Sequence, residues 1–269
     1  MAITALYASA TGMRALDTKL NVLANNLANI NTVGFKRSRT NFEDLFYQTL
    51  VEPGTQNATG QEPIPTGLQV GLGATVSGTQ LNFTQGSVDV TNMDYDLAIQ
   101  GDGFFQVKTW EGGEEVTAYT RAGNFTINAN GNLVLANSEG SVLEPAITIG
   151  QDVQDVEINS AGQIMIRQQG QTNFTQAGQI QLARFINPAG LKTIGKNLYM
   201  ATDASGEAIV GNPTEQGLGQ IQQGAVEMSN VDPVRELVDL IQTQRYFELN
   251  SQAIQVSDDT LQLISNLRR

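Results

Sequence analysis

Carboxylates are the side chains of this sequence whose spacing could support acid–base chemistry. Two acidic groups stand out, namely Asp94, Asp96 and Asp102, and then Asp152, Asp155 and Glu157. A pair of carboxyl groups that flanks a glycosidic bond can hydrolyse it. Aromatic residues, on which sugars would stack, make up only 6% of the chain, and Trp110 is the sole tryptophan. We therefore expect no catalytic residues among these carboxylates.

Histidine and cysteine are both absent from the chain. Without histidine, the commonest general base at neutral pH and the usual zinc ligand are missing. Without cysteine there is no thiol nucleophile and no disulfide framework. Ser-His-Asp and Cys-His catalysis are therefore excluded, and the sequence predicts a protein that is not an enzyme.

Glycine-rich and asparagine-rich stretches give no cofactor or metal site. Gly71-Leu-Gly73 and Gly101-Asp-Gly103 each begin like a phosphate-binding loop but lack its third glycine, so we interpret the second as a turn. The segment 128–132 resembles a calcium loop only loosely, because it lacks the acidic ligands and the distal glutamate. We expect no cofactor and no metal.

The charge and hydropathy of the chain exclude further classes of partner. The net charge is −12, whereas nucleic-acid binding needs concentrated lysine and arginine. The one basic cluster is Lys36, Arg37 and Arg39, which we interpret as a solvated helix exit. No apolar run approaches the roughly 18 residues of a membrane span, and the N-terminus lacks a basic segment. We expect no membrane insertion and no cleaved secretion signal.

Long helices are predicted at both ends of the chain, over residues 3–30 and from Asp232 to Leu267. Asp232 suits an N-cap, and Pro233 suits the first helical position. Apolar residues recur with heptad spacing in both segments, as in the seam of a coiled coil. The predicted assembly seam consists of Leu6, Met13, Leu16, Leu20, Leu23, Leu27 and Ile30 at the N-terminus and Leu240, Phe247, Ile254 and Leu261 at the C-terminus.

A second row in the C-terminal segment, Leu249, Val256 and Leu263, also recurs every seven residues. Two rows on different sides predict a helix that contacts more than one neighbour. The alternative is that both helices pack into the core of an ordinary domain. Their lengths favour assembly, since the average helix has only about 11–12 residues.

The central part of the chain is predicted to be β-rich. Residues 42–50 keep helical spacing, and residues 51–67 carry many prolines and glycines, as expected for an extended arm. Leu68, Val70 and Leu72 then alternate as in a strand. Turn signals at Asn130-Gly131, 160–162, 187–190 and 205–206 predict four hairpins.

The predicted fold class is α+β, mainly β. A discontinuous terminal α-helical coiled-coil domain comprises residues 1–40 with 231–269. An extended arm covers 41–75, and a central β-domain covers 76–230.

Four stretches together resemble the bacterial flagellar rod and hook proteins: Ala24–Lys36, Asp96–Val107, Tyr119–Phe125 and Asn230–Gln255. The resemblance extends over essentially the whole chain. It departs from the family pattern at Tyr246-Phe247 and at Pro233, neither of which disturbs the match. The length and the segment Asp44–Gly73 favour a subunit of the distal rod within this family.

The resemblance implies a structural subunit of the flagellar basal body that forms a helical homo-oligomer, a hollow tube across the periplasm. The implied partners are the proximal rod proteins, the hook protein, the P- and L-ring bushing proteins and the flagellar type III export apparatus. Export by that apparatus would need no cleaved signal peptide.

Three alternatives stay open. The chain could be a hook subunit or a proximal rod subunit of the same family. It could also be a secreted β-domain that binds glycans or a receptor and is trimerised by its terminal helices.

Overall fold

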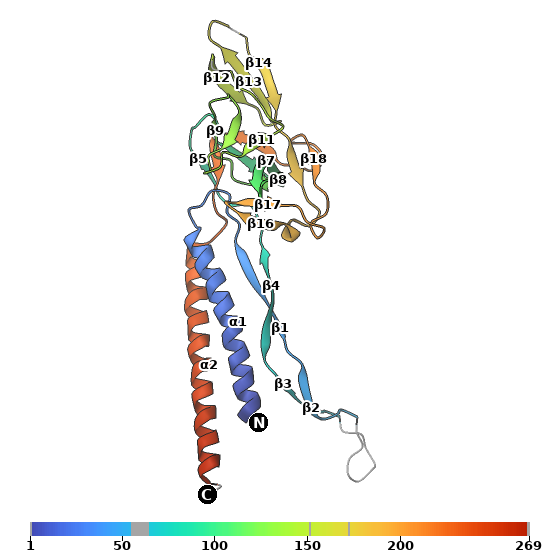
Figure 1. The fold of residues 1–269 in the computed structure, drawn as a ribbon, viewed down its shortest axis with the longest axis vertical. Coiled ribbons are helices and arrows are strands. Elements are labelled where there is room, and N and C mark those ends of the chain that lie inside the picture. Colours follow the sequence, from blue (N-terminus) through green and yellow to red (C-terminus); the bar gives the residue numbers. More distant parts are fainter. Residues whose placement is uncertain (1, 55–64, 151, 172, 268–269) are drawn as a thin grey trace. The chain divides into compact units, whose positions relative to one another are not determined.

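The computed structural model describes residues 2–54, 65–150, 152–171 and 173–267. Contacts divide the chain into two compact units, which are described separately (Figure 1). The helical unit comprises Met1–Ala28, Ser38–Leu81 and Asp232–Arg269. The β-rich unit comprises Asn29–Arg37 and Asn82–Val231. The predicted α+β class, mainly β, is confirmed.

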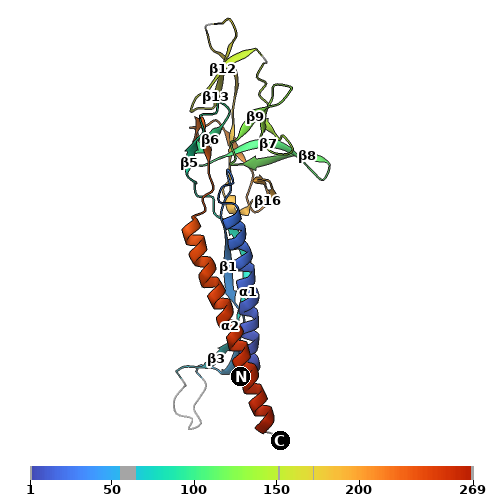
Figure 2. The same cartoon turned by 90° about the vertical axis from the view of Figure 1, so that its left-hand side faces the viewer.

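Two long helices, α1 (Ala2–Ala28) and α2 (Pro233–Leu267), dominate the helical unit. The Asp232 carboxylate caps α2, because its Oδ1 accepts hydrogen bonds from the backbone N–H groups of Val234 (3.0 Å) and Arg235 (3.3 Å). The two helices lie side by side in both views (Figure 1, Figure 2). The helices and the N-cap predicted from the sequence are therefore present.

A long β-ribbon completes the helical unit. Strands β1 (Ser38–Asp44) and β4 (Ala74–Leu81) pair antiparallel, with an irregularity between Asn41 and Phe42. Strands β2 (Tyr47–Val51) and β3 (Leu68–Gly71) continue the ribbon as a hairpin. The helix expected from the spacing of residues 42–50 is not formed, because residues 42–44 belong to β1 and residues 47–50 belong to β2. The part of the predicted arm at 55–64 lies outside the described residues.

The β-rich unit is built on one large sheet with the strand order β16-β17-β8-β7-β11-β10-β9, to which β15 and β18 are added beside β7. Its strands are β7 (Phe104–Glu111), β8 (Glu114–Thr120), β9 (Phe125–Ile127), β10 (Leu133–Leu135), β11 (Val142–Glu144), β15 (Leu182–Arg184), β16 (Lys192–Gly195), β17 (Leu198–Met200) and β18 (Ile209–Gly211).

Smaller sheets surround this large one. They are β12 (Val153–Ile158), β13 (Gln163–Gln168) and β14 (Thr175–Gln179) in one sheet, β6 (Leu97–Gln100) with β19 (Gln220–Gln223), and β5 (Val88–Val90) with β20 (Ala225–Glu227). All described strand pairs are antiparallel. The core of this unit is aliphatic and aromatic and includes Leu97, Ile99, Phe105, Leu143 and Ile164, all completely buried.

Two of the four predicted hairpins are confirmed. Asn130-Gly131 joins β9 to β10, and the turn at 160–162 joins β12 to β13. The other two were wrong, since β15 pairs with β7 and β18, and β16 pairs with β17. Residues 188–190 instead form a short 3-10 helix. Turn residues identify where the chain reverses, but they do not identify which strands then pair.

The unit boundaries differ from the predicted domains, because the described part of the predicted arm joins the helical unit and Val231 joins the β-rich unit. Two further segments also change unit. Residues 76–81 belong with the helices, because they form β4, which pairs with β1. Residues 29–37 belong with the β-rich unit, where Gly34 N–H donates to the Glu227 carbonyl (2.7 Å). No helix in the part of the chain that the structure describes is long and apolar enough to span a membrane.

Candidate assembly interface

Two of the six candidate catalytic carboxylates, Asp96 and Asp155, have structural partners. Asp96 is nearly buried and accepts a hydrogen bond from the Thr91 hydroxyl (2.6 Å). Asp155 forms a salt bridge with Arg167 across the β12–β13 pair. Gly101 and Gly103 have positive φ angles and form the turn between β6 and β7. Within the described ranges, no group of three or more Asp and Glu side chains could hold a metal ion.

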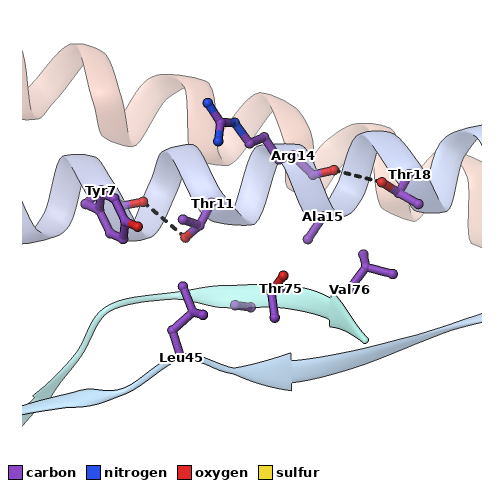
Figure 3. Close-up of a pocket in the computed structure, with 9 residues that line it drawn as sticks. Tyr7, Thr11, Arg14, Ala15, Thr18, Leu45, Thr75 and Val76 are labelled. Carbon is purple, nitrogen blue, oxygen red and sulfur yellow. Dashed lines mark hydrogen bonds between the residues drawn. The ribbon is translucent and has the colours of Figure 1, made fainter. Parts of the chain in front are cut away.

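A cavity of about 320 Å³ lies between α1 and the β1–β4 ribbon. Figure 3 shows Leu45 and Val76 directed from the ribbon toward α1, whereas the Arg14 side chain points away from the ribbon. The hydroxyls of Thr11 and Thr18 donate to backbone carbonyls of their own helix, at 3.1 Å to Tyr7 and 3.2 Å to Arg14. Leu45 and Val76 therefore pack the ribbon against the helix, and the two threonine hydroxyls are engaged by hydrogen bonds within the helix.

Asn26 joins three elements at one end of the helical unit. Its side chain bonds both backbone groups of Ser38 in β1, donating to the carbonyl (2.8 Å) and accepting from the N–H (3.0 Å). It also donates to Glu236 Oε2 of α2 at 3.1 Å. Asn26 is 0% exposed and Glu236 is 1% exposed. A buried polar contact of this kind favours one register of the packed helices, because a shifted pairing would lose the hydrogen bond between Asn26 and Glu236.

The same register continues along the helix pair. A Cβ atom at Gly12, two heptads before Asn26, would lie 3.5 Å from the amide nitrogen of Asn250, two heptads after Glu236. The helices therefore run antiparallel, and α1 approaches α2 closely at this glycine.

The face of α2 toward α1 combines two rows. The apolar row is Leu240, Phe247, Ile254 and Leu261, predicted as part of the seam; three of these are half-buried and Phe247 is 37% exposed. A polar row, Glu236, Thr243, Asn250 and Ser257, alternates with it. The sequence analysis missed the polar row, although its strict seven-residue spacing was the signal that could have revealed it.

The predicted seam residues of α1 have similar burial. Leu23 is 6% exposed, and Leu6, Met13, Leu16, Leu20, Leu27 and Ile30 are half-buried, although Ile30 follows the helix and belongs to the β-rich unit. Much of the seam therefore has a partner within the same chain.

The second row of α2 is different, because it is solvent-exposed. Leu249 is 59% exposed, Val256 64% and Leu263 62%. The β2–β3 hairpin is also exposed and apolar, with Phe46 at 89% and Leu68 at 54%, whereas Val70 and Leu72 are half-buried. Large contiguous apolar surface on a folded chain marks a surface for association.

A buried charge network lies in the β-rich unit. Glu227 Oε1 accepts hydrogen bonds from Lys36 Nζ (2.6 Å) and the Gly86 N–H (2.8 Å), and its Oε2 accepts from Arg121 Nη1 (3.2 Å). Lys36 is completely buried, so its interpretation as part of a solvated helix exit was wrong. Burial lowers the pKa of the Lys36 ammonium, while the Glu227 carboxylate opposes that shift.

Gly34 explains part of the sequence motif around Lys36. Its φ is +70°, and a Cβ there would lie 2.4 Å from the Ala122 backbone nitrogen. Only glycine fits this close approach. The Ala24–Lys36 motif therefore contains both the asparagine that joins the helices to β1 and the lysine of the buried network.

These features define a structural class: a subunit whose two chain ends form one antiparallel helical unit with an exposed apolar face. Three family descriptions match parts of the chain. "Flagella basal body rod protein" matches residues 6–36, "Flagellar hook protein FlgE/F/G D1 domain" matches 98–166, and "Flagellar basal body rod FlgEFG protein C-terminal" matches 222–267.

Full-length relatives agree with these matches. The flagellar basal-body rod protein FlgG of Caulobacter vibrioides is 43% identical over 98% of this chain and 99% of its own length. The proteins of the same name from Agrobacterium fabrum and Bacillus subtilis are 44% identical over 97% of this chain and 98% of their length, and 38% identical over 99% and 100%, respectively. The chain belongs to the flagellar basal-body rod protein family, and it is a structural subunit of the distal rod. The family resemblance noted in the sequence is thereby confirmed.

Proposed function

We propose that this chain polymerises with copies of itself into a hollow helical tube that crosses the periplasm and transmits torque. The observation that carries the proposal is the exposed second row of α2, Leu249, Val256 and Leu263, beside a first row that α1 already contacts. Burying side chains of this size stabilises a contact by about 1.5–3 kcal/mol each. Contacts that do not close into a ring generate a filament.

The predicted assembly seam and the exposed second row of α2 have different roles in this proposal. The inner row of α2 and its counterpart on α1 hold the helical hairpin of one subunit together, and the outer row contacts the neighbouring subunit. The terminal helices would line the inside of the tube, and the β-rich units would lie outside.

The β-ribbon and the β2–β3 hairpin, with Leu68, Val70 and Leu72, serve as the arm. An isolated two-stranded hairpin is only marginally stable in water. Its exposed apolar residues therefore favour a position along a neighbouring subunit, where they would limit bending of the tube.

The choice of partners and of an export route rests on membership of the rod family. The proposed partners are the proximal rod proteins, the hook protein, the P- and L-ring bushing proteins and the type III export apparatus. Export by this apparatus would proceed without a cleaved signal peptide. The chain would carry no enzymatic activity, since its sequence contains neither histidine nor cysteine.

Sedimentation and electron microscopy of the purified chain test the proposal. We expect open-ended, straight tubes whose mass grows with protein concentration. A discrete trimer of fixed mass by light scattering would contradict tube formation and would support a trimerised binding module instead.

A further inference from the structure

A groove with three apolar walls lies within the helical unit. It has a volume of about 380 Å³. Its lining includes Gly12, Ala15 and Leu16 of α1, Phe42 of β1, and Tyr246 and Leu249 of α2. The aromatic rings of Phe42 and Tyr246 line two sides of the groove, and they are 42% and 52% exposed, respectively. The α1 part of the lining consists of two small residues, Gly12 and Ala15, and Leu16. This shape suits the apolar side chains of a helix.

The first turns of α2 present an exposed apolar stripe. Val234, Leu237, Val238 and Ile241 have the i, i+3, i+4, i+7 spacing by which an amphipathic helix fits into a groove. Their exposed fractions are 69%, 46%, 47% and 50%, respectively. The stripe (residues 234–241) and the α2 residues that line the groove (246–250) occupy different turns of the same helix. A chain therefore cannot place its own stripe in its own groove.

We propose that the stripe of one copy packs into the groove of the next copy. This inference rests on the proposed self-assembly and names the surfaces that carry it. The contact is head-to-tail, because each copy offers its stripe to one neighbour and its groove to another. A contact of this kind repeats without closing and yields a filament.

Two observations identify a second copy as the occupant. The groove is continuous with the established α1–α2 contact, since Asn250 lines the groove and also faces Gly12. A further helix placed there extends an existing helical packing. The charges also complement each other, because Asp44 is exposed two residues after Phe42 in β1, where strand alternation places both on one face, and Arg235 is exposed within the stripe segment. Exposed opposite charges at the rim of a contact set its orientation.

Cysteine pairs test the contact on a background that contains no cysteine. One preparation carries Leu237→Cys in the stripe, and the other carries Leu249→Cys in the groove. The two are mixed, allowed to polymerise and treated with a short bismaleimide. We expect a covalent dimer that dominates in the mixed sample over either preparation alone. The matched control replaces Leu249→Cys by Gln252→Cys, an exposed position off both apolar rows.

The outcomes separate this inference from the proposed function. If polymers sediment normally but the mixed sample gives no more dimer than the Gln252→Cys control, the stripe–groove contact is refuted while self-assembly stands. If the unmodified chain forms no polymer, self-assembly itself is refuted. A cross-linked species that stops at a closed dimer would overturn the head-to-tail arrangement. As a second variant, Ile241→Asp should abolish polymerisation and leave the melting of the monomer unchanged, because this side chain is half exposed.

Discussion

Lys36 and Glu227 lie 191 residues apart in the sequence and form a 2.6 Å salt bridge in which neither side chain is exposed. Lys36 Nζ also donates to the Thr84 carbonyl (2.8 Å). One ion pair therefore joins the segment after α1, the segment after the ribbon and the last strand of the β-rich unit. Removing one member of such a pair leaves a buried charge without its partner.

The first prediction concerns this salt bridge. Lys36→Met should destabilise the β-rich unit by about 3 kcal/mol, since Glu227 keeps Arg121 but loses its closest cation. Urea unfolding followed by the β-sheet circular dichroism signal measures the change. The matched control is Lys196→Met, which removes a solvent-exposed bridge to Glu139 and should change the midpoint little. Equal effects of both substitutions would contradict the special role of the buried pair.

The second prediction concerns alkaline pH. Burial, and then the Glu227 carboxylate, raise the pKa of the Tyr199 phenol above its ordinary value of 10.0. The folded chain therefore keeps a proton that the unfolded chain loses, so the stability present below about pH 10 falls as the pH rises further. Lys36 acts in the opposite direction, because its lowered pKa makes the folded chain release a proton first.

Urea midpoints between about pH 8 and pH 11 measure this dependence. Tyr199→Phe should make the decline with pH shallower, because the phenol that resists ionisation is gone. An unchanged slope would show that other groups dominate alkaline unfolding.

The third prediction concerns the junction of α1, β1 and α2. Asn26→Ala removes a buried hydrogen bond to Glu236 and two partly buried hydrogen bonds to Ser38. Leaving such groups unsatisfied costs about 1–3 kcal/mol each, so the helical signal should melt earlier while the β-sheet signal is retained. Asn21→Ala, an exposed position on the same helix, is the control. Simultaneous early loss of both signals would mean that the two units do not unfold independently.

The fourth prediction concerns the inner row of α2. Phe247→Ala together with Ile254→Ala should weaken the helical hairpin by at least about 1 kcal/mol for each residue and abolish polymerisation. Sedimentation of polymer and thermal melting of the monomer check the two effects. Gln252→Ala, off both apolar rows, should be nearly silent. Normal polymers from the double variant would show that assembly does not depend on the packing of the inner row against α1.

The fifth prediction concerns the arm. The Leu45 N–H donates to the Gly73 carbonyl at 2.8 Å, so residues 46–72 can be replaced by an Asn-Gly turn without disturbing β1 and β4. The shortened chain should still polymerise, but its tubes should bend, because the proposed contact along the neighbour is lost. Electron micrographs give the curvature directly. Straight tubes from the shortened chain would assign stiffness to another element.

The sequence by itself determined the elements with strong local signals. Asp232 and Pro233 identified the start of α2, and Asn130-Gly131 identified the β9–β10 turn, because capping and tight turns depend on neighbouring residues. The heptad rows predicted the helical pairing, and four motifs predicted the family. The turn at Gly101-Asp-Gly103 was also identified correctly, because glycine suits the positive φ angles of such a turn.

Only the tertiary structure decided what depends on distant partners. Residues 42–50 have helical spacing, yet β4, about thirty residues away in the sequence, pairs with β1 and makes the beginning of this segment a strand. Lys36 and Glu236 resemble surface charges in the sequence, and their burial follows from Glu227 and Asn26, which no local pattern connects to them. Long-range pairing supplies the hydrogen bonds that make a buried charge tolerable, and this information is absent from any short window of sequence.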